Sequence, residues 1–139
     1  TGDIDGTARL LNGLARAHLK MRQYAPAQAL FVESQAIAKR FQLLSLWHLA
    51  QIYLAALQAY TGDLQEGIRA LEATLAAYEK EQPEKFGLLQ AEFLLGNAYK
   101  LARRVGPTNQ HYVRALGYAR DLGLDRYVRE ITREMKEAF

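Results

Sequence analysis

The stretch Phe93–Leu101, Phe-Leu-Leu-Gly-Asn-Ala-Tyr-Lys-Leu, sets the register of this chain. Within it, Leu95, Gly96 and Tyr99 follow a Leu-Gly-x-x-Tyr spacing. Similar spacings recur on both sides of the stretch, so a search for internal repeats comes before any other interpretation. The register predicts an all-helical repeat scaffold.

Three copies of one pattern can be aligned from this stretch, displaced by 40 and 41 residues. The first copy contains Leu11, Leu14, Ala15, His18, Ala27, Phe31 and Ser34. The second contains Gln51, Leu54, Ala55, Gln58, Gly67, Leu71 and Thr74. The third contains Glu92, Leu95, Gly96, Tyr99, Thr108, Tyr112 and Ala115, and a partial fourth contains Val128, Ile131, Thr132 and Met135. A fixed offset of this size indicates stacked supersecondary units rather than a generic bundle.

Composition gives the same fold class. Good helix formers such as alanine, leucine and glutamine dominate the segments between the 3 prolines, and runs of β-branched residues are absent. The chain of 139 residues is 50% apolar, enough for the core of one all-α domain over residues 1–139. It begins Thr-Gly-Asp, and we expect it to be part of a longer protein.

Apolar residues at helical spacing, separated by turn signals, predict about seven helices. The first six residues are expected to form a frayed lead-in, and Pro83 to begin the fifth helix. Gly62 is expected in a left-handed conformation after the third helix, followed by Asp63 as the N-cap of the fourth. The predicted hairpins span about 7–41, 43–81 and 84–122, and a capping helix spans about 125–138.

This spacing resembles the tetratricopeptide repeat, in which small residues stand where adjacent helices approach closely. Those positions are taken here by Ala15, Ala55 and Gly96 in the first helices and by Ala27, Gly67 and Thr108 in the second. His18 and Gln58 stand where the family favours an aromatic residue, and no copy ends in the family's proline. The period exceeds the usual one by about six residues, which is similar to repeat arrays of bacterial transcription regulators and signalling proteins.

The resemblance implies a right-handed α-solenoid of three hairpins plus the capping helix, with the first helix of each hairpin lining a concave groove. In that register the groove would bind a partner protein or peptide through Arg9, Asn12, Arg16, Lys20, Tyr53, Tyr60, Phe93, Asn97, Lys100, Arg129 and Arg133. Gln90 and Arg126 would line the same wall. Basic ends around an aromatic middle suit an acidic segment or a C-terminal carboxylate. The alternative is a solvated arginine face, partly paired with Glu130 and Glu134.

Two other partners remain open. Arg103-Arg104 and the arginines of the last helix could follow nucleic-acid phosphates, although the net charge of +3 and the interspersed acidic residues make this the weaker interpretation. Apolar outer or end faces could instead join copies of the chain into a homo-oligomer.

No pattern in the chain predicts an enzyme. It has no glycine-rich phosphate loop, no nucleophile elbow, and no histidine with the spaced companion that a metal site needs. We therefore expect no cofactor and no metal. Cysteine is absent and no apolar run reaches the length of a membrane span, so we expect a cytoplasmic location without membrane partners.

Overall fold

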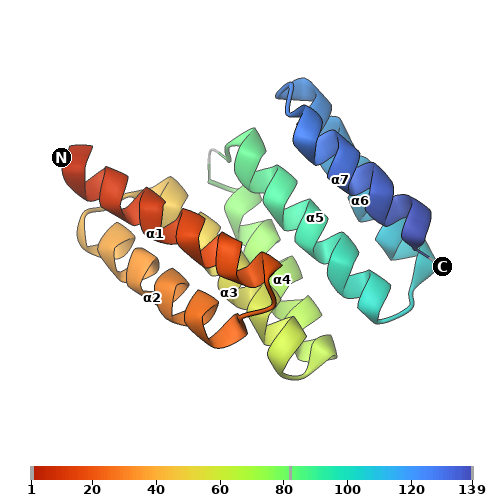
Figure 1. Cartoon of the computed structure of the whole chain (residues 1–139), viewed down its shortest axis with the longest axis horizontal. Helices are drawn as coiled ribbons and strands as arrows, with labels where there is room; N and C mark the ends of the chain where they lie inside the picture. The colour runs from red at the N-terminus through yellow and green to blue at the C-terminus, as the bar shows by residue number, and fades with distance from the viewer. Residues whose placement is uncertain (1, 82, 139) are drawn as a thin grey trace.

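The computed structural model describes residues 2–81 and 83–138, and all regular secondary structure in these ranges is α-helical. Its seven helices, shown in Figure 1, confirm the prediction of an all-α fold and its number of helices. They are α1 (Gly2–Lys20), α2 (Tyr24–Arg40), α3 (Leu44–Thr61), α4 (Leu64–Glu79), α5 (Lys85–Leu101), α6 (Val105–Asp121) and α7 (Asp125–Glu137). None of the helices in the described ranges is long and apolar enough to cross a membrane.

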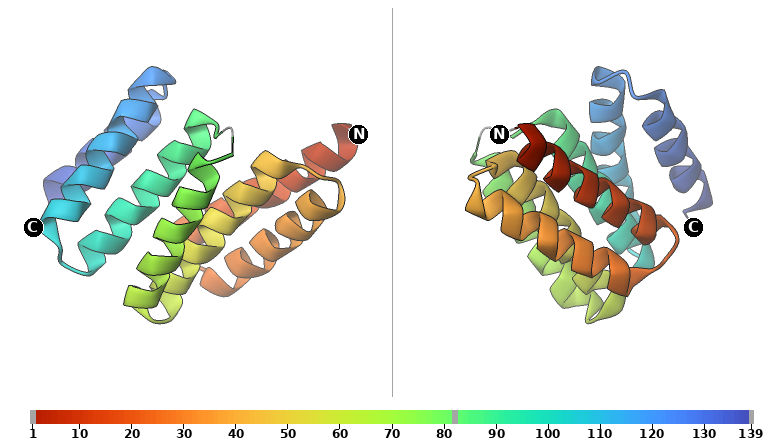
Figure 2. Two further views of the ribbon diagram at one scale, coloured as in Figure 1. Left: turned by 180° about the vertical axis from the view of Figure 1, so that it is seen from behind. Right: turned by 60° about the vertical axis from the view of Figure 1, so that its left-hand side comes forward.

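The helices pack mainly against their neighbours in the chain. The pairs α1/α2, α3/α4 and α5/α6 form hairpins, and the helices α2 and α3, α4 and α5, and α3 and α5 join one hairpin to the next. Helix α7 packs on α6 at the far end from α1 (Figures 1 and 2).

Glycine permits the closest helix contacts. A Cβ atom on Gly67 of α4 would overlap the backbone of Ala59 in α3, and one on Gly96 of α5 would overlap the ring of Tyr112 in α6. A larger residue at either position would have to push the two helices of its hairpin apart. The expectation that these two small residues mark close helix approach is therefore confirmed.

Four of the corners between helices share one geometry. Arg22, Gln42, Arg103 and Gly123 have φ values of 58°, 57°, 59° and 67°, in the left-handed region. At each corner the next residue's N–H donates to a helix carbonyl five positions earlier, as Leu43 N does to Ala38 O at 2.8 Å. This is the Schellman pattern, which satisfies the last carbonyls of a helix and sets the direction of the next one.

The corner between α3 and α4 has a different geometry and was predicted only in part. Gly62 has φ −127° and ψ −138°, so its expected left-handed conformation is wrong. The Asp63 side chain does accept the backbone N–H of Glu66 at 3.0 Å, which confirms the predicted N-cap. Glu66 pairs with Arg69 on the helix surface.

Some predicted helix ends also differ. Residues 2–6 are helical rather than a frayed lead-in, and Thr7 Oγ1 donates to Asp3 O at 2.8 Å within this first part of α1. Helix α5 begins at Lys85, two residues after Pro83, and α6 begins at Val105 with Pro107 inside its first turn. A proline is tolerated there because the first N–H groups of a helix have no intrahelical acceptor.

Helix α5, which carries the register-setting stretch, belongs to two hydrophobic clusters. Leu94 and Leu95 pack with residues of α2, α3 and α4, while Leu89 and Phe93 pack with α6 and α7. Helix α5 is therefore buried on more than one side and forms the base of the space between α1 and α7.

Candidate functional site: a groove between the first and last helices

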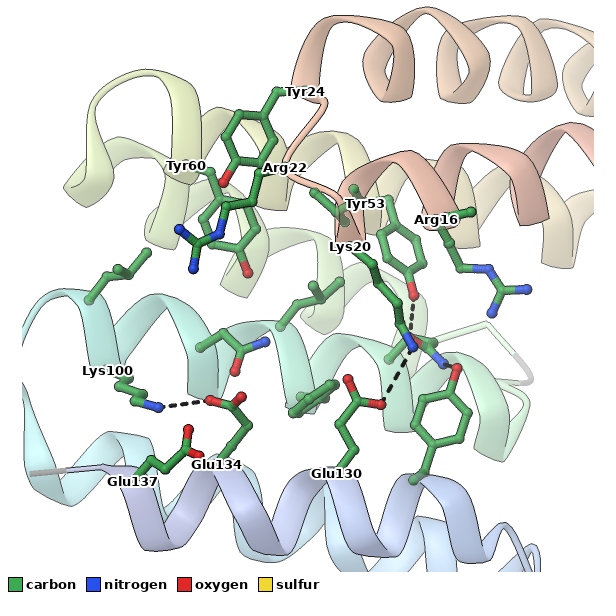
Figure 3. A pocket seen from close by; sticks show the side chains of 18 of the residues that line it. Arg16, Lys20, Arg22, Tyr24, Tyr53, Tyr60, Lys100, Glu130, Glu134 and Glu137 are labelled. Carbon is green, nitrogen blue, oxygen red and sulfur yellow. Dashed lines mark hydrogen bonds and ion pairs between the residues drawn. The ribbon is translucent and has the colours of Figure 1, made fainter.

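A groove of about 990 Å³ lies over α5, between α1, the start of α2 and the end of α3 on one side and α7 on the other (Figure 3). The structure brings seven of the predicted site residues together along it. These are Arg16, Lys20, Tyr53, Tyr60, Phe93, Asn97 and Lys100. Gln90 and Arg126, also expected on this wall, line it as well.

Four predicted site residues lie outside the groove lining. Arg9 is exposed and pairs with Asp5, with 3.0 Å between Nε and Oδ2. Asn12 is only 2% exposed, and neither atom of its side-chain amide has a hydrogen-bond partner among the described residues. Arg129 and Arg133 are exposed on α7 but do not line the groove.

Helical phase explains the difference on α7. Its groove side carries residues spaced at three and four positions, namely Arg126, Tyr127, Glu130, Glu134 and Glu137. Arg129 and Arg133 are one position away from Glu130 and Glu134, so their side chains project about 100° around the helix from them. The sequence shows that these arginines share one face of the helix, but it does not show which way that face points in the folded molecule.

Aromatic side chains form much of the groove wall. Tyr53 of α3 stacks on Phe31 of α2, with ring centroids 4.8 Å apart and planes 10° from parallel. Tyr60 lies near Tyr24 at the start of α2, with ring centroids 6.2 Å apart. Tyr53 and Phe93 are 4% and 8% exposed, so they present edges to the groove rather than protruding from it.

A chain of hydrogen bonds crosses the groove from α3 to α7. The Tyr53 hydroxyl donates to Gln90 Oε1, and Gln90 Nε2 donates to the Tyr127 hydroxyl at 2.9 Å. One amide offers an acceptor at one end and donors at the other, so it can accept the proton of only one of the two phenols. In the orientation above, the Tyr127 O–H proton is left for another acceptor. Reversing the amide would free the Tyr53 proton instead.

The Arg16 guanidinium lies at the same end of the groove. It is 5.6 Å from the centre of the Phe86 ring, and its buried Nε has no hydrogen-bond partner in residues 2–81 and 83–138. Within the described part of the chain no carboxylate lies within 4.0 Å of it. Burial raises the pKa of Tyr53, and the charge of Arg16 and a hydrogen bond from its side chain oppose that rise only partly, so the phenol stays protonated near neutral pH.

The two predicted lysines are already engaged. Lys20 Nζ is 3.6 Å from Glu130 Oε2, and Lys100 Nζ is 2.7 Å from Glu134 Oε2, and both pairs are marked in Figure 3. The first pair joins α1 to α7 and the second joins α5 to α7. The groove lining contains six basic and three acidic side chains. Its charge is mixed, whereas the sequence predicted ends that carry only basic residues.

Asn97 is held by its surroundings. Its Oδ1 accepts the Tyr112 hydroxyl at 2.5 Å. Burial raises the pKa of the neighbouring Tyr60, an effect that a hydrogen bond from Asn97 counteracts only in part. The amide of Asn97 is thus oriented by the two tyrosines, with an edge toward the groove.

Several groove residues were missed from the sequence. Arg22, Tyr24, Arg103, Tyr127 and the three glutamates of α7 line it, although none was predicted to. Arg22 and Arg103 are corner residues, whose direction depends on the left-handed turns. Tyr127 and the glutamates could not be found from the repeat register, because aligning α7 with α5 places Arg129 and Arg133 on the groove side instead.

No family model matches this chain, and the comparison with curated proteins produced no match either. What can be inferred about function therefore comes from the groove itself.

Proposed function

We propose that this chain is a protein-interaction module that binds a segment of a partner protein in the groove between α1 and α7. The module would be a right-handed solenoid of three tetratricopeptide-like hairpins with α7 as its capping helix. The repeated register, the pairing of successive helices and the close contacts at Gly67 and Gly96 support that architecture.

Groove size favours a segment of polypeptide. Pockets for small ligands occupy about 300–1,000 Å³, and a groove of about 990 Å³ lies at the top of that range. Aromatic edges along its wall suit the side chains of an extended or helical peptide.

The observation that carries the proposal is the unpaired donor set at the Arg16 end. Within the described residues, the Arg16 guanidinium beside this chain has no carboxylate partner, and the Tyr127 phenol proton has no acceptor. Both are donors, so they complement an anionic acceptor such as a carboxylate. The ligand is therefore a segment that carries an aspartate, a glutamate or a C-terminal carboxylate.

The same geometry weakens the nucleic-acid alternative. Glu130, Glu134 and Glu137 face the groove and would repel a phosphate backbone lying along it. A short segment with a single carboxylate can meet Arg16 while avoiding most of α7.

The test is a screen of peptides with free or amidated C-termini against the wild type and three variants. Arg16→Gln removes the unpaired charge, Tyr127→Phe removes only the hydroxyl, and Arg129→Gln removes an exposed arginine outside the groove. A charge-assisted hydrogen bond contributes about 1.5–3 kcal/mol, so Arg16→Gln should weaken the binding of selected peptides about tenfold to a hundredfold. Tyr127→Phe should have a smaller effect.

Arg129→Gln should bind like the wild type. The proposal fails if no peptide is retained, or if Arg129→Gln and Arg16→Gln weaken binding equally. Circular dichroism of each variant checks that its helices are intact. If only peptides with free C-termini bind, the carboxylate is terminal, and if amidation has no effect it belongs to a side chain.

A further inference from the structure

An apolar stripe runs along α1 to Met21, just after its end, and the described part of the chain does not cover it. Leu10, Leu14 and Met21 are 63%, 46% and 59% exposed, and Ala17 between them is exposed as well. Their spacing of four, three and four residues places them on one face of the helix. That face lies opposite Ala8 and Ala15, the residues through which α1 packs into the fold.

The positions of Leu10, Leu14 and Ala17 are interior in the other two hairpins, whereas that of Met21 is taken there by the exposed Thr61 and the partly buried Ala102. Displaced by 40 residues the three positions are Ala50, Leu54 and Leu57 of α3, and displaced by a further 41 they are Ala91, Leu95 and Ala98 of α5. Five of these six are buried and Leu54 is partly so. They lie where α3 and α5 meet the preceding hairpin through α2 and α4. The stripe on α1 therefore continues a surface that elsewhere in this chain is a helix–helix contact.

The opposite end of the molecule cannot supply the missing contact. Helix α7 covers α6 with Ile131 and turns Arg129, Arg133 and Lys136 outward. A head-to-tail arrangement would press these charges against the leucines of a neighbouring α1. The stripe is better matched by a second α1, which offers an identical apolar seam.

Charge sets the direction of such a pair. Helix α1 has Asp3 and Asp5 in its first turn and His18 and Lys20 in its last. Two copies packed antiparallel bring the acidic end of one helix beside the basic end of the other, whereas a parallel pair brings like charges together. The helix dipoles favour the antiparallel arrangement too.

We propose that the α1 stripe is a self-association surface, at which two copies of this chain pack α1 against α1, antiparallel about a two-fold axis. An isologous contact of this type closes after two subunits. Leu10, Leu14 and Met21 do not line the groove, whereas Ala17 does, so the stripe borders the groove along α1.

Sedimentation equilibrium of the wild type, from micromolar to submillimolar concentration, should show a monomer–dimer equilibrium. Leu14→Glu places a charge at the centre of the seam and should raise the dissociation constant at least about tenfold. Val113→Glu is the matched control, because Val113 is a 57% exposed apolar residue on α6, away from the stripe. It should leave the equilibrium unchanged. A wild type that is monomeric throughout, or equal effects of the two variants, would overturn the proposal.

A second measurement tests the direction of packing. The chain has no cysteine, so a single introduced thiol can form a disulfide only with its counterpart in another copy. Near the centre of an antiparallel seam Leu14 approaches its own counterpart, whereas Met21 at the end does not. Leu14→Cys should therefore cross-link at least about tenfold faster than Met21→Cys. Equal cross-linking of both would indicate a parallel pair and contradict the proposed arrangement.

Discussion

At the scale of single residues, the corners between helices are the least expected feature. Three of the four left-handed corners hold Arg22, Gln42 and Arg103 rather than glycine. A side chain in this conformation crowds the following carbonyl, which costs roughly 1–2 kcal/mol. The Schellman hydrogen bonds at each corner offset that strain.

Glycine should therefore stabilise such a corner. We expect Gln42→Gly to raise the free energy of unfolding by about 0.5–1 kcal/mol, because relief of the strain outweighs the greater freedom of glycine in the unfolded chain. Gly123→Ala, the reverse change at the equivalent corner, should lower it by about 1–2 kcal/mol. Urea denaturation of both variants measures this. A Gln42→Gly protein less stable than the wild type would show that Gln42 makes a contact outweighing its strain.

At the scale of helices, two glycines with opposite surroundings separate packing from helix propensity. Gly67 meets the backbone of Ala59, whereas Gly117 on α6 has no atom within 4 Å of where its Cβ would lie. The same substitution to alanine should act in opposite directions. Gly67→Ala should lower the free energy of unfolding by about 1–3 kcal/mol through overpacking, and Gly117→Ala should raise it by about 0.5–1 kcal/mol.

Thermal unfolding followed by circular dichroism distinguishes the two effects. If both variants shifted the midpoint in the same direction, the close contact between α3 and α4 would not control the stability of this hairpin. Gly117→Ala is the control, because it changes helix propensity without creating a close contact.

The sequence predicted the helices better than the corners. Periodic apolar residues identified all seven, and Asp63 was correctly identified as a cap because its side chain acts locally. The non-glycine left-handed corners had no such signal, since arginine and glutamine rarely adopt that conformation. The left-handed conformation predicted for Gly62 was wrong because glycine permits the left-handed region without requiring it.

At the scale of the whole molecule, buried tyrosines link the helices and make stability depend on alkaline pH. Burial raises the pKa of Tyr53, Tyr60 and Tyr112, and burial together with Glu72 raises that of Tyr99 to about 12. Because these folded-state pKa values lie above the ordinary tyrosine pKa of 10.0, the contribution of these tyrosines to stability is fully present below pH 10. It is lost as the pH rises toward and through the folded-state values.

We expect the free energy of unfolding to be flat approaching pH 10 and to fall above it. Tyrosinate absorbance should rise together with the loss of helical signal, since most phenols ionise only on unfolding. A protein whose tyrosines ionised near pH 10 with its helices intact would contradict this. Tyr53→Phe removes one of the titrating groups and should make the decline above pH 10 shallower.

The sequence predicted most of the residues on one wall of the groove, but not the acidic residues on the opposite wall. The repeat register placed Arg16, Tyr53, Tyr60 and Phe93 on one wall because each first helix has the same phase. It did not place the glutamates of α7 opposite Lys20 and Lys100, because the rotation of α7 depends on how Ile131 packs against α6. Long-range pairs of this kind depend on the assembled molecule and have no local signal.

The Lys20–Glu130 pair joins helices from the two ends of the chain across the groove. The separation of α1 from α7 is thus also the width of the opening into which a partner segment would fit. A tension pulling the two ends of the molecule apart would widen the opening and speed release, and an occupied groove would resist that stretching. By linkage, a force that separates the ends of the molecule would weaken binding of the segment, and a bound segment would increase the force needed to separate the ends.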